Sequence, residues 1–153
     1  MEAHSRNYAY LKNKLDMFEI KKGINLNKFL VNTDINTIFD NQQHVLGYSL
    51  HACDISGNTK ETKISNKWKD LLFEEFFAQG EIERKEGVPI SILCDRNSSK
   101  INHSQVGFIN FVVKPTFELL MNIFPEIYPL LNNLKINLRN LQKLAKEDDE
   151  RKI

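Results

Sequence analysis

The sequence predicts an all-α protein, a helical bundle. Apolar residues recur at intervals of three and four over most of the chain, which is the spacing of one face of a helix. Glycine or proline follows the longest of these stretches, where helices commonly end. No two runs alternate between apolar and polar residues in the manner of paired strands.

The bulk properties of the chain narrow its class further. A length of 153 residues allows one hydrophobic core, so residues 1–153 are expected to form a single domain. The chain is 41% hydrophobic and 27% charged, as in ordinary folded proteins, and its net charge is +1. So small a charge gives no support for nucleic-acid binding or for a polybasic membrane tether.

The cysteines and the N-terminus indicate a cytoplasmic environment. Cys53 and Cys94 are too few for a disulfide framework and have apolar neighbours, so both are expected to be reduced and buried. The first ten residues lack the apolar core of a signal peptide. No apolar run approaches the ~20 residues of a membrane span, so no membrane segment is expected.

The first third of the chain predicts two helices. One covers residues 5–20, ends at the cations and glycine of residues 21–23, and is followed by an asparagine-rich connector over residues 23–33. The next covers residues 34–53, with Asp34 as its N-cap. Its expected apolar stripe consists of Ile35, Ile38, Phe39, Gln42, Leu46, Leu50 and Cys53.

The middle of the chain predicts a long helix over residues 65–86. Gly87 ends it and Pro89 prevents its continuation. A short extended piece, residues 89–94, and a polar loop, residues 95–100, follow. The expected apolar face of the helix consists of Trp68, Leu71, Leu72, Phe76 and Phe77.

The last third predicts three helices. One begins near Asn102 and breaks before Pro115, a short one carries Phe117, Leu120 and Met121, and a long one covers residues 125–146. The long helix has a heptad-like seam that either packs on the core or forms a coiled coil. Residues 147–153 are expected to be a charged, frayed tail. The seam consists of Ile127, Leu131, Leu134, Leu138, Leu141 and Ala145.

Asp54 is the first candidate for chemistry. A carboxylate at a helix end, before a tight Ser-Gly-Asn turn, can bind a hard metal ion. It can equally cap the turn that follows it. His51 lies three residues earlier and shares its helix face, but one such pair does not make a metal site.

Gln105 and Phe108 are the second candidate. Residues three apart on a helix are neighbours, so a planar amide and an aromatic ring would lie together, with Gly107 allowing close packing beside them. The amide matches the hydrogen-bonding edge of a purine, and the ring offers a surface for stacking. Alternatively, Gln105 completes a capping box with Asn102, and Phe108 belongs to the core.

Three segments together resemble the C-terminal part of the catalytic domain of class I 3′,5′-cyclic nucleotide phosphodiesterases. These are HACDISGNTK at residues 51–60, WKDLLFEEFFAQGEIERKEGVPISILCDR at 68–96 and SQVGFINFVVKPTFE at 104–118. They occur in the family's order and separation, and the resemblance covers most of residues 34–140. AHSRNYAYL, at residues 3–11, is a weaker match to an earlier helix of the family.

The resemblance implies a role for each candidate. Asp54 looks like a metal-ligand aspartate, Gln105 like the purine-selecting glutamine, and Phe108 like the aromatic that clamps the base. Leu72 matches the opposite side of the clamp. Trp68 and Leu93 match other pocket residues. The implied reaction is hydrolysis of the cyclic purine nucleotides cAMP or cGMP to 5′-nucleotides, with zinc and magnesium as metals.

The chain also departs from the family pattern. The H-N-x-x-H segment and the H-D pair, which supply most metal ligands and the general acid, are absent from the sequence. The isolated chain is therefore expected to be an inactive fragment of the domain. Gly57 replaces an asparagine, and Ser65 replaces a residue that is often larger.

Two other readings of the sequence stay open. One is a non-catalytic helical module that binds nucleotides or regulates a partner, and that associates with itself through exposed helices. The other is a structural bundle with no ligand.

Overall fold

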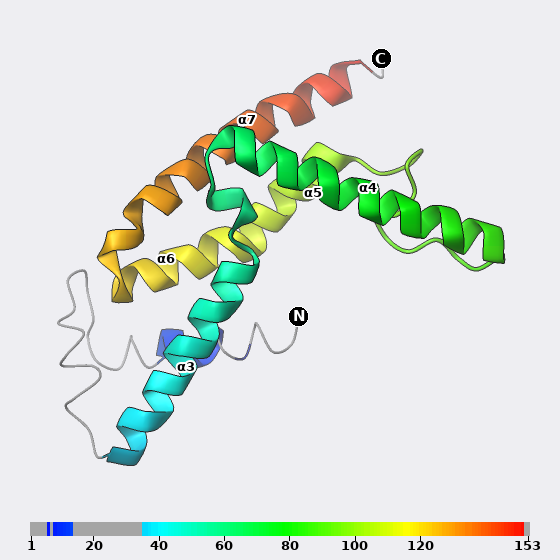
Figure 1. The fold of residues 1–153 in the computed structure, drawn as a ribbon. Coiled ribbons are helices and arrows are strands. Elements are labelled where there is room, and N and C mark those ends of the chain that lie inside the picture. The colour runs from blue at the N-terminus through cyan, green and yellow to red at the C-terminus, as the bar shows by residue number, and fades with distance from the viewer. Residues whose placement is uncertain (1–5, 7, 14–34, 152–153) are drawn as a thin grey trace. The chain divides into compact units, whose positions relative to one another are not determined.

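A computed structural model describes residues 6, 8–13 and 35–151 of the chain (Figure 1). Within these ranges the regular structure is helical and no strand occurs, so the all-α prediction is confirmed. Residues 8–13 are helical and fall inside the first predicted helix. The rest of that helix, its end at residues 21–23, the connector over residues 23–33 and the Asp34 cap lie outside the described residues.

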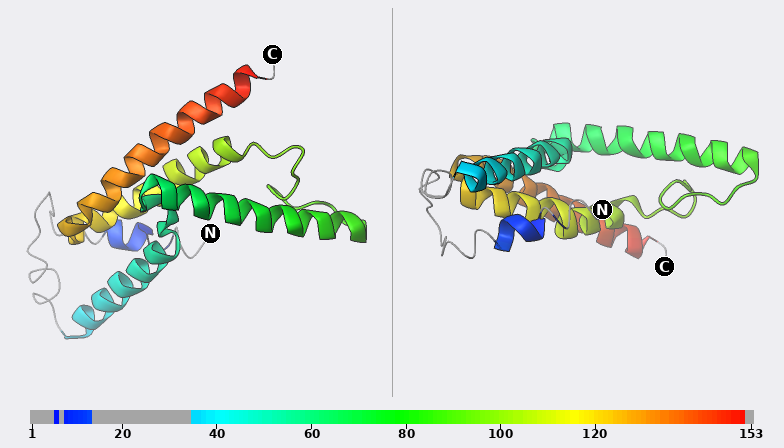
Figure 2. Two further views of the ribbon diagram at one scale, coloured as in Figure 1. Left: turned by 45° about the horizontal axis from the view of Figure 1, so that its top comes forward. Right: turned by 90° about the horizontal axis from the view of Figure 1, so that it is seen from below.

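The chain divides into two compact units, with helices in each (Figures 1 and 2). Met1–Ser56 and Val112–Leu131 form the first unit, and Gly57–Phe111 and Asn132–Ile153 form the second. The assignment of residues 1–153 to a single domain stays a prediction. The first unit holds α3 (Ile35–Asp54), α6 (Lys114–Ile123) and η3 (Pro125–Ile127); the second holds α4 (Thr62–Glu86), α5 (Ile101–Phe108) and most of α7 (Tyr128–Glu150).

The core of the first unit lies between α3 and α6, which contact each other. On α3 the buried side chains are Val45, Tyr48 and Ala52, spaced at three and four residues as one helix face requires. Burial raises the pKa of Tyr48 to about 12, against a smaller opposite effect of the Thr116 hydroxyl. From α6 the core receives Thr116, Phe117, Leu119, Leu120 and Ile123.

The predicted stripe of α3 is therefore wrong over the residues whose side chains are described. Leu46 and Leu50 are 70% and 74% exposed, and Gln42 and Cys53 are also exposed. The helix carries a second apolar stripe, formed by Val45, Tyr48 and Ala52, and α6 packs on that side of the helix. The expected burial of Cys53 is wrong for the same reason, whereas Cys94 is buried as predicted. The side chains of Ile35, Ile38 and Phe39 lie outside the description.

In the second unit, the side chain of Asn137 in α7 forms hydrogen bonds with the turn that precedes α4. Its amide nitrogen donates to the backbone carbonyls of Asn58 and Lys60 at 2.9 and 2.8 Å. Its amide oxygen accepts a hydrogen bond of 2.7 Å from the Thr62 hydroxyl in the first turn of α4. Asn133, one turn earlier, donates to the Thr59 carbonyl at 3.2 Å. The short helix η1 (Ser56–Thr59) is thus held by side-chain amides.

The buried face of α4 differs from the predicted one. Ser65, Phe73, Phe77 and Gly80 are buried, whereas Trp68, Leu71 and Leu72 are 60%, 52% and 41% exposed. Of the predicted face, only Phe77 is fully buried and Phe76 partly so. The apolar side chains of α4 are distributed around the helix, and the loop after α4 packs on the face that contains Phe77 and Gly80.

The end of α4 agrees with the prediction. Gly87 adopts φ 70°, in the left-handed region, and its N–H donates to the carbonyl of Arg84. The N–H of Val88 donates to the carbonyl of Glu83. This is the usual way in which glycine ends a helix.

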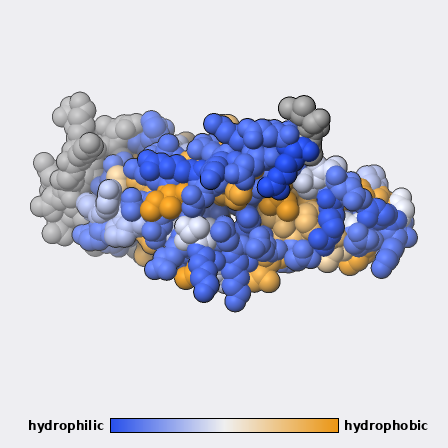
Figure 3. Space-filling view, turned by 90° about the horizontal axis from the view of Figure 1, so that it is seen from above, coloured by the Kyte–Doolittle hydropathy of each residue, from blue (hydrophilic) through white to orange (hydrophobic). Residues whose placement is uncertain are grey.

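On the face shown in Figure 3, hydrophobic side chains lie among the hydrophilic ones.

The predicted break before Pro115 does not occur. Helical structure continues from Ile101 to Ile123, with a π-helical turn over Ile109–Val113 directly before Lys114. Proline lacks an N–H, and its ring would collide with the carbonyl four residues earlier in a regular α-helix. The wider turn relieves this conflict.

By length and composition, Ile101–Ile123 could cross a membrane, whereas no membrane segment was expected from the sequence. The core helix of a soluble protein passes the same test, so this is weak support for a membrane span. Gln105 and Thr116 are buried polar residues of this stretch. Their burial inside the protein favours a core helix.

Most of the predicted seam of the last helix is buried, but the helix begins at Tyr128 instead of residue 125 and continues past residue 146. Leu131, Leu134, Leu141 and Ala145 are buried, as packing on the core requires. The helix continues to Glu150, so residues 147–150 are not frayed. The reason is a set of polar contacts with α5, which a sequence pattern cannot show.

Candidate functional site

Gln105 lies in the second turn of α5 and is only 7% exposed. Within the described part of the chain, its side chain makes no hydrogen bond. The capping-box alternative is wrong, because α5 begins at Ile101 and its N-cap residue, Lys100, makes no side-chain cap. The amide atoms nevertheless keep some contact with solvent, so the amide is available to a ligand.

Phe108 follows one helical turn after Gln105 and is the last residue of α5. Its side chain is 38% exposed, so part of the ring is accessible. It is therefore not plain core. The close packing expected at Gly107 is absent, since a Cβ added there would meet nothing within 4 Å.

Trp68 and Leu72 lie four residues apart on α4, so they share one face of that helix. Both are exposed, together with Leu71. Gly57 lies against this face, since a Cβ added to it would be 3.9 Å from the Cβ of Trp68. An exposed indole with aliphatic neighbours is suited to contact with an apolar or aromatic ligand.

Leu93 lies in the loop between α4 and α5, in a turn with φ 71°. It lines an open hollow of about 480 Å³ with residues of the same loop and with His103 and Ser104 of α5. Gln105 directly follows Ser104, so Leu93 lies next to the turn of α5 that carries the candidate amide. Neither Gln105 nor Phe108 lines the hollow itself.

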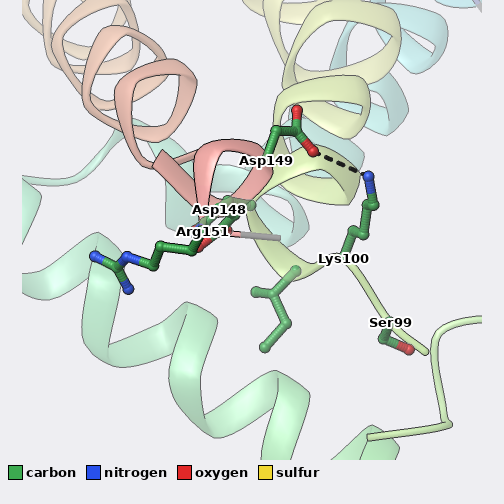
Figure 4. Close-up of a pocket in the computed structure, with 7 residues that line it drawn as sticks. Ser99, Lys100, Asp148, Asp149 and Arg151 are labelled. Atoms are coloured by element: carbon green, nitrogen blue, oxygen red, sulfur yellow. Dashed lines mark hydrogen bonds and ion pairs between the residues drawn. The ribbon is translucent and has the colours of Figure 1, made fainter. Parts of the chain in front are cut away.

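A second hollow, of about 410 Å³, lies between the start of α5 and the end of α7 (Figure 4). Lys100 donates a hydrogen bond of 3.0 Å to Asp149, and His103 lies 2.9 Å from the other oxygen of the same carboxylate. Asn102 donates to Asp148 at 2.8 Å. The bond from Lys100, with a smaller effect of His103, lowers the pKa of Asp149. These groups neutralise one another, and their role is to hold α7 against α5.

Asp54 is the last residue of α3 and is exposed. Among described residues its carboxylate has no hydrogen bond or ion pair, so it does not cap the turn that follows. It lies in the first unit, whereas Gln105, Phe108, Leu72, Leu93 and Trp68 all lie in the second.

The described residues do not fit a two-metal centre. Over residues 6, 8–13 and 35–151, no three His, Cys, Asp or Glu side chains gather where they could hold a metal ion. A single carboxylate does not supply the ligands that two divalent ions need. Asp54 can contribute only one carboxylate.

Sequence reasoning missed the residues that position the loop between α4 and α5. Arg96 donates to both oxygens of Glu74, at 2.9 and 3.2 Å, and its guanidinium lies 4.5 Å from the centre of the Phe77 ring. The hydrogen bond from Arg96 lowers the pKa of Glu74. The partners are 22 residues apart, and no periodicity connects them.

Comparison with known proteins decides the family. The model of the 3′5′-cyclic nucleotide phosphodiesterase family matches residues 1–134. The chain belongs to this family. The resemblance of the three sequence segments is thereby confirmed.

Individual members of the phosphodiesterase family show how much of a relative this chain spans. A dual specificity calcium/calmodulin-dependent 3′,5′-cyclic nucleotide phosphodiesterase 1B of Mus musculus is 45% identical over 89 residues, which is 58% of this chain and 17% of that protein. A 3′,5′-cyclic-AMP phosphodiesterase, isoform F, of Drosophila melanogaster is 34% identical over 134 residues, 87% of this chain and 20% of that protein.

A solved phosphodiesterase structure has the same fold. The phosphodiesterase domain of the Salpingoeca rosetta rhodopsin phosphodiesterase superposes with a TM-score of 0.79 at 25% identity, over 99% of this chain and 43% of that one. The chain thus spans about a fifth of its curated relatives and less than half of this solved phosphodiesterase domain.

Proposed function

We propose that this chain forms the purine-binding part of a phosphodiesterase catalytic domain that hydrolyses cAMP, cGMP or both to 5′-nucleotides. Gln105 hydrogen-bonds the edge of the base and Phe108 stacks on its face. Leu72, Leu93 and Trp68 complete the apolar lining. Asp54 supplies one ligand to the metals of the complete domain, zinc and magnesium. The protein acts in the cytoplasm or at the cytoplasmic face of a membrane.

The observation that carries this proposal is the mostly buried side chain of Gln105, whose amide forms no hydrogen bond to a described residue and keeps some contact with solvent. Gln105 is only 7% exposed, yet its side chain forms no hydrogen bond to another described residue. A purine offers an adjacent donor and acceptor that an amide can match in either orientation. The partly exposed ring of Phe108 one turn later adds a stacking surface, worth about 1–3 kcal/mol per base in nucleic-acid sites.

A titration of the purified chain with cAMP and cGMP, followed by amide chemical shifts, tests the proposal. We expect shifts at Gln105 and Phe108, and a loss of binding in Gln105→Ala. Gln142→Ala is the matched control, because Gln142 is an exposed glutamine of α7. Equal binding by Gln105→Ala and the unsubstituted chain would remove the assignment of the base site.

A second candidate is a non-catalytic module that binds nucleotide or regulates a partner. The described residues lack a metal cluster, which is the observation that favours it. Tight binding of cAMP that depends on Gln105 and is unchanged by a metal chelator would support the module. Hydrolysis of cAMP by the purified chain would exclude it.

A further inference from the structure

A second row of side chains runs along the solvent side of α4, opposite the buried face of this helix. The buried face is formed by Ser65, Phe73, Phe77 and Gly80. Each residue of an α-helix is turned by about 100° from the one before it, so a row with a repeat of three and four residues keeps to one side. All members of the second row are exposed. They are Glu61, Ile64, Trp68, Leu71, Glu75, Ala78, Ile82 and Lys85, and we call them the outer seam of α4.

The outer seam is mostly apolar between its two charged ends. Its four large apolar side chains are between 45% and 60% exposed. The apolar part extends from Ile64 to Ile82, which is about 27 Å along the helix. A continuous apolar row of this length favours burial against another chain. Because its repeat is that of a coiled-coil seam, the natural occupant is one further helix.

The order of the side chains makes the outer seam complementary to itself. Opposite charges lie at its two ends, an isoleucine follows each charge, and the largest side chain then corresponds to the smallest. Two antiparallel copies of α4, related by a two-fold axis, would bring these partners together. Counted inwards from the ends, the pairs are Glu61 with Lys85, Ile64 with Ile82, Trp68 with Ala78, and Leu71 with Glu75.

Charge also selects the antiparallel direction. In a parallel pair, Glu61 and Glu75 would each face their own equivalents, and like charges in contact are unfavourable. In the antiparallel pair, the charge of Glu61 meets that of Lys85. Lys67 and Glu81 directly precede two members of the seam and flank it on the same side, so they also meet across the pair. The same sequence thus supplies both halves of each charge pair.

We propose that two copies of this chain pair through the outer seam of α4, antiparallel and about a two-fold axis. The seam contains no residue of α3, so association through α3 adds to this pair and does not replace it. The pairing does not depend on the proposed function, but it affects it. Trp68 belongs to the seam and to the proposed purine lining, so a second copy and a nucleotide exclude each other at this ring.

Trp68 is the only tryptophan of the chain, so its fluorescence reports the pair. Pairing buries the indole, which is 60% exposed in the single chain, against Ala78 of the second copy. We expect the emission maximum of the purified chain to move to shorter wavelength as its concentration rises. Leu71→Lys puts a charge into the seam at a position that is 52% exposed, and should keep the emission maximum of the separate chain at every concentration.

Glu75→Leu tests the seam by strengthening it. This glutamate is the charged member of the innermost pair, and a leucine there extends the apolar row. We expect the midpoint of the fluorescence change to fall to an about tenfold lower concentration. Asp70→Leu is the matched control, because Asp70 is an exposed acidic residue of α4 outside the seam. It removes the same charge and adds the same side chain, and should leave the midpoint unchanged.

Exchange of charges tests the antiparallel direction. Lys67→Glu and Glu81→Lys each bring like charges together across the pair, and should each raise the midpoint concentration about tenfold. The double variant Lys67→Glu/Glu81→Lys should restore it, because opposite charges meet again. Within one chain Glu81 bonds Arg84 at 3.0 Å. That bond is lost in Glu81→Lys and in the double variant alike, so the restored affinity comes from contact between copies.

Three results would overturn the pairing. One is the same emission maximum in the unsubstituted chain and in Leu71→Lys throughout the concentration range. The second is an equal effect of Glu75→Leu and Asp70→Leu. The third is a double charge variant that pairs as weakly as the single ones, which would leave the seam to a helix of another protein. These measurements use no nucleotide, so a chain that binds no cAMP would lose the proposed function and keep the pair.

Discussion

At the residue scale, the buried side chain of Asn137 forms hydrogen bonds with three other residues. Asn137 is 3% exposed and bonds to Asn58, Lys60 and Thr62. Asn137→Ala would leave two carbonyls and a hydroxyl without this partner in a mostly dry environment. We expect a loss of about 3 kcal/mol in the free energy of unfolding, measured by urea denaturation.

Asn140→Ala is the control for this substitution, because Asn140 is an exposed asparagine of the same helix. Alanine has the higher helix propensity, so a small gain in stability is expected at that position. Equal stability of the two variants would show that the bonds of Asn137 contribute nothing net.

A pair of glycines makes a second residue-scale prediction. Gly80→Ala would drive a methyl group into the Cys94 carbonyl, 2.0 Å away, whereas a Cβ at Gly47 meets nothing within 4 Å. We expect Gly80→Ala to lower the free energy of unfolding by about 1–3 kcal/mol. Gly47→Ala should raise it by about 0.5–1 kcal/mol, the helix-propensity difference. Thermal unfolding of both variants checks the opposite signs.

At the element scale, the end of α7 depends on the charge of Asp149. The hydrogen bond from Lys100, and then that from His103, lowers the pKa of Asp149 below its usual range. A carboxyl group whose pKa is lowered by folding adds stability above its unfolded pKa of about 4, and this is lost as the pH falls through the folded value. We therefore expect amides of residues 147–150 to lose protection from exchange on acidification from about pH 5.

Asp149→Asn serves to isolate this effect. The amide cannot ionise, so protection of the last turn of α7 should be low already at neutral pH and should depend less on pH. Glu150→Gln, at an exposed residue that does not contact Lys100 or His103, should behave like the unsubstituted chain. The same pH profile in Asp149→Asn would assign the acid sensitivity to another group.

The sequence predicts the helices well and their buried faces poorly. The C-terminal end of α4 and most of the seam of α7 follow local rules, namely a left-handed glycine and a repeat of three and four. On α3 and α4 the apolar residues surround much of the helix, so spacing cannot choose between Leu46 and Val45, or between Leu72 and Phe73. The π-helical turn before Pro115 was not predicted either, because proline normally predicts a break in a helix.

In the candidate site, too, some residues could be predicted from the sequence and others could not. Gln105 and Phe108 could be found from a local spacing, and the family resemblance added Leu72, Leu93, Trp68 and Asp54. Glu74 and Arg96 could not be found, because they are 22 residues apart and only the folded backbone brings them together. The burial and missing hydrogen bonds that make Gln105 informative are likewise properties of the fold.

At the scale of the whole molecule, the exposed stripe of α3 predicts self-association. Leu46 and Leu50 are large apolar side chains exposed one turn apart, with the exposed Cys53 next in line. The net charge of +1 supplies little repulsion between copies. Contiguous apolar surface of this kind favours burial against another chain.

Sedimentation velocity over a range of concentrations measures this association. We expect the mean sedimentation coefficient to rise with concentration under reducing conditions, and the rise to disappear in Leu46→Lys/Leu50→Lys. Gln42→Lys/Gln43→Lys adds the same charge to exposed polar positions of α3 and controls for repulsion alone. If both double variants suppress association equally, charge and not the apolar stripe governs it; if the unsubstituted chain stays monomeric throughout, α3 makes no contact between copies.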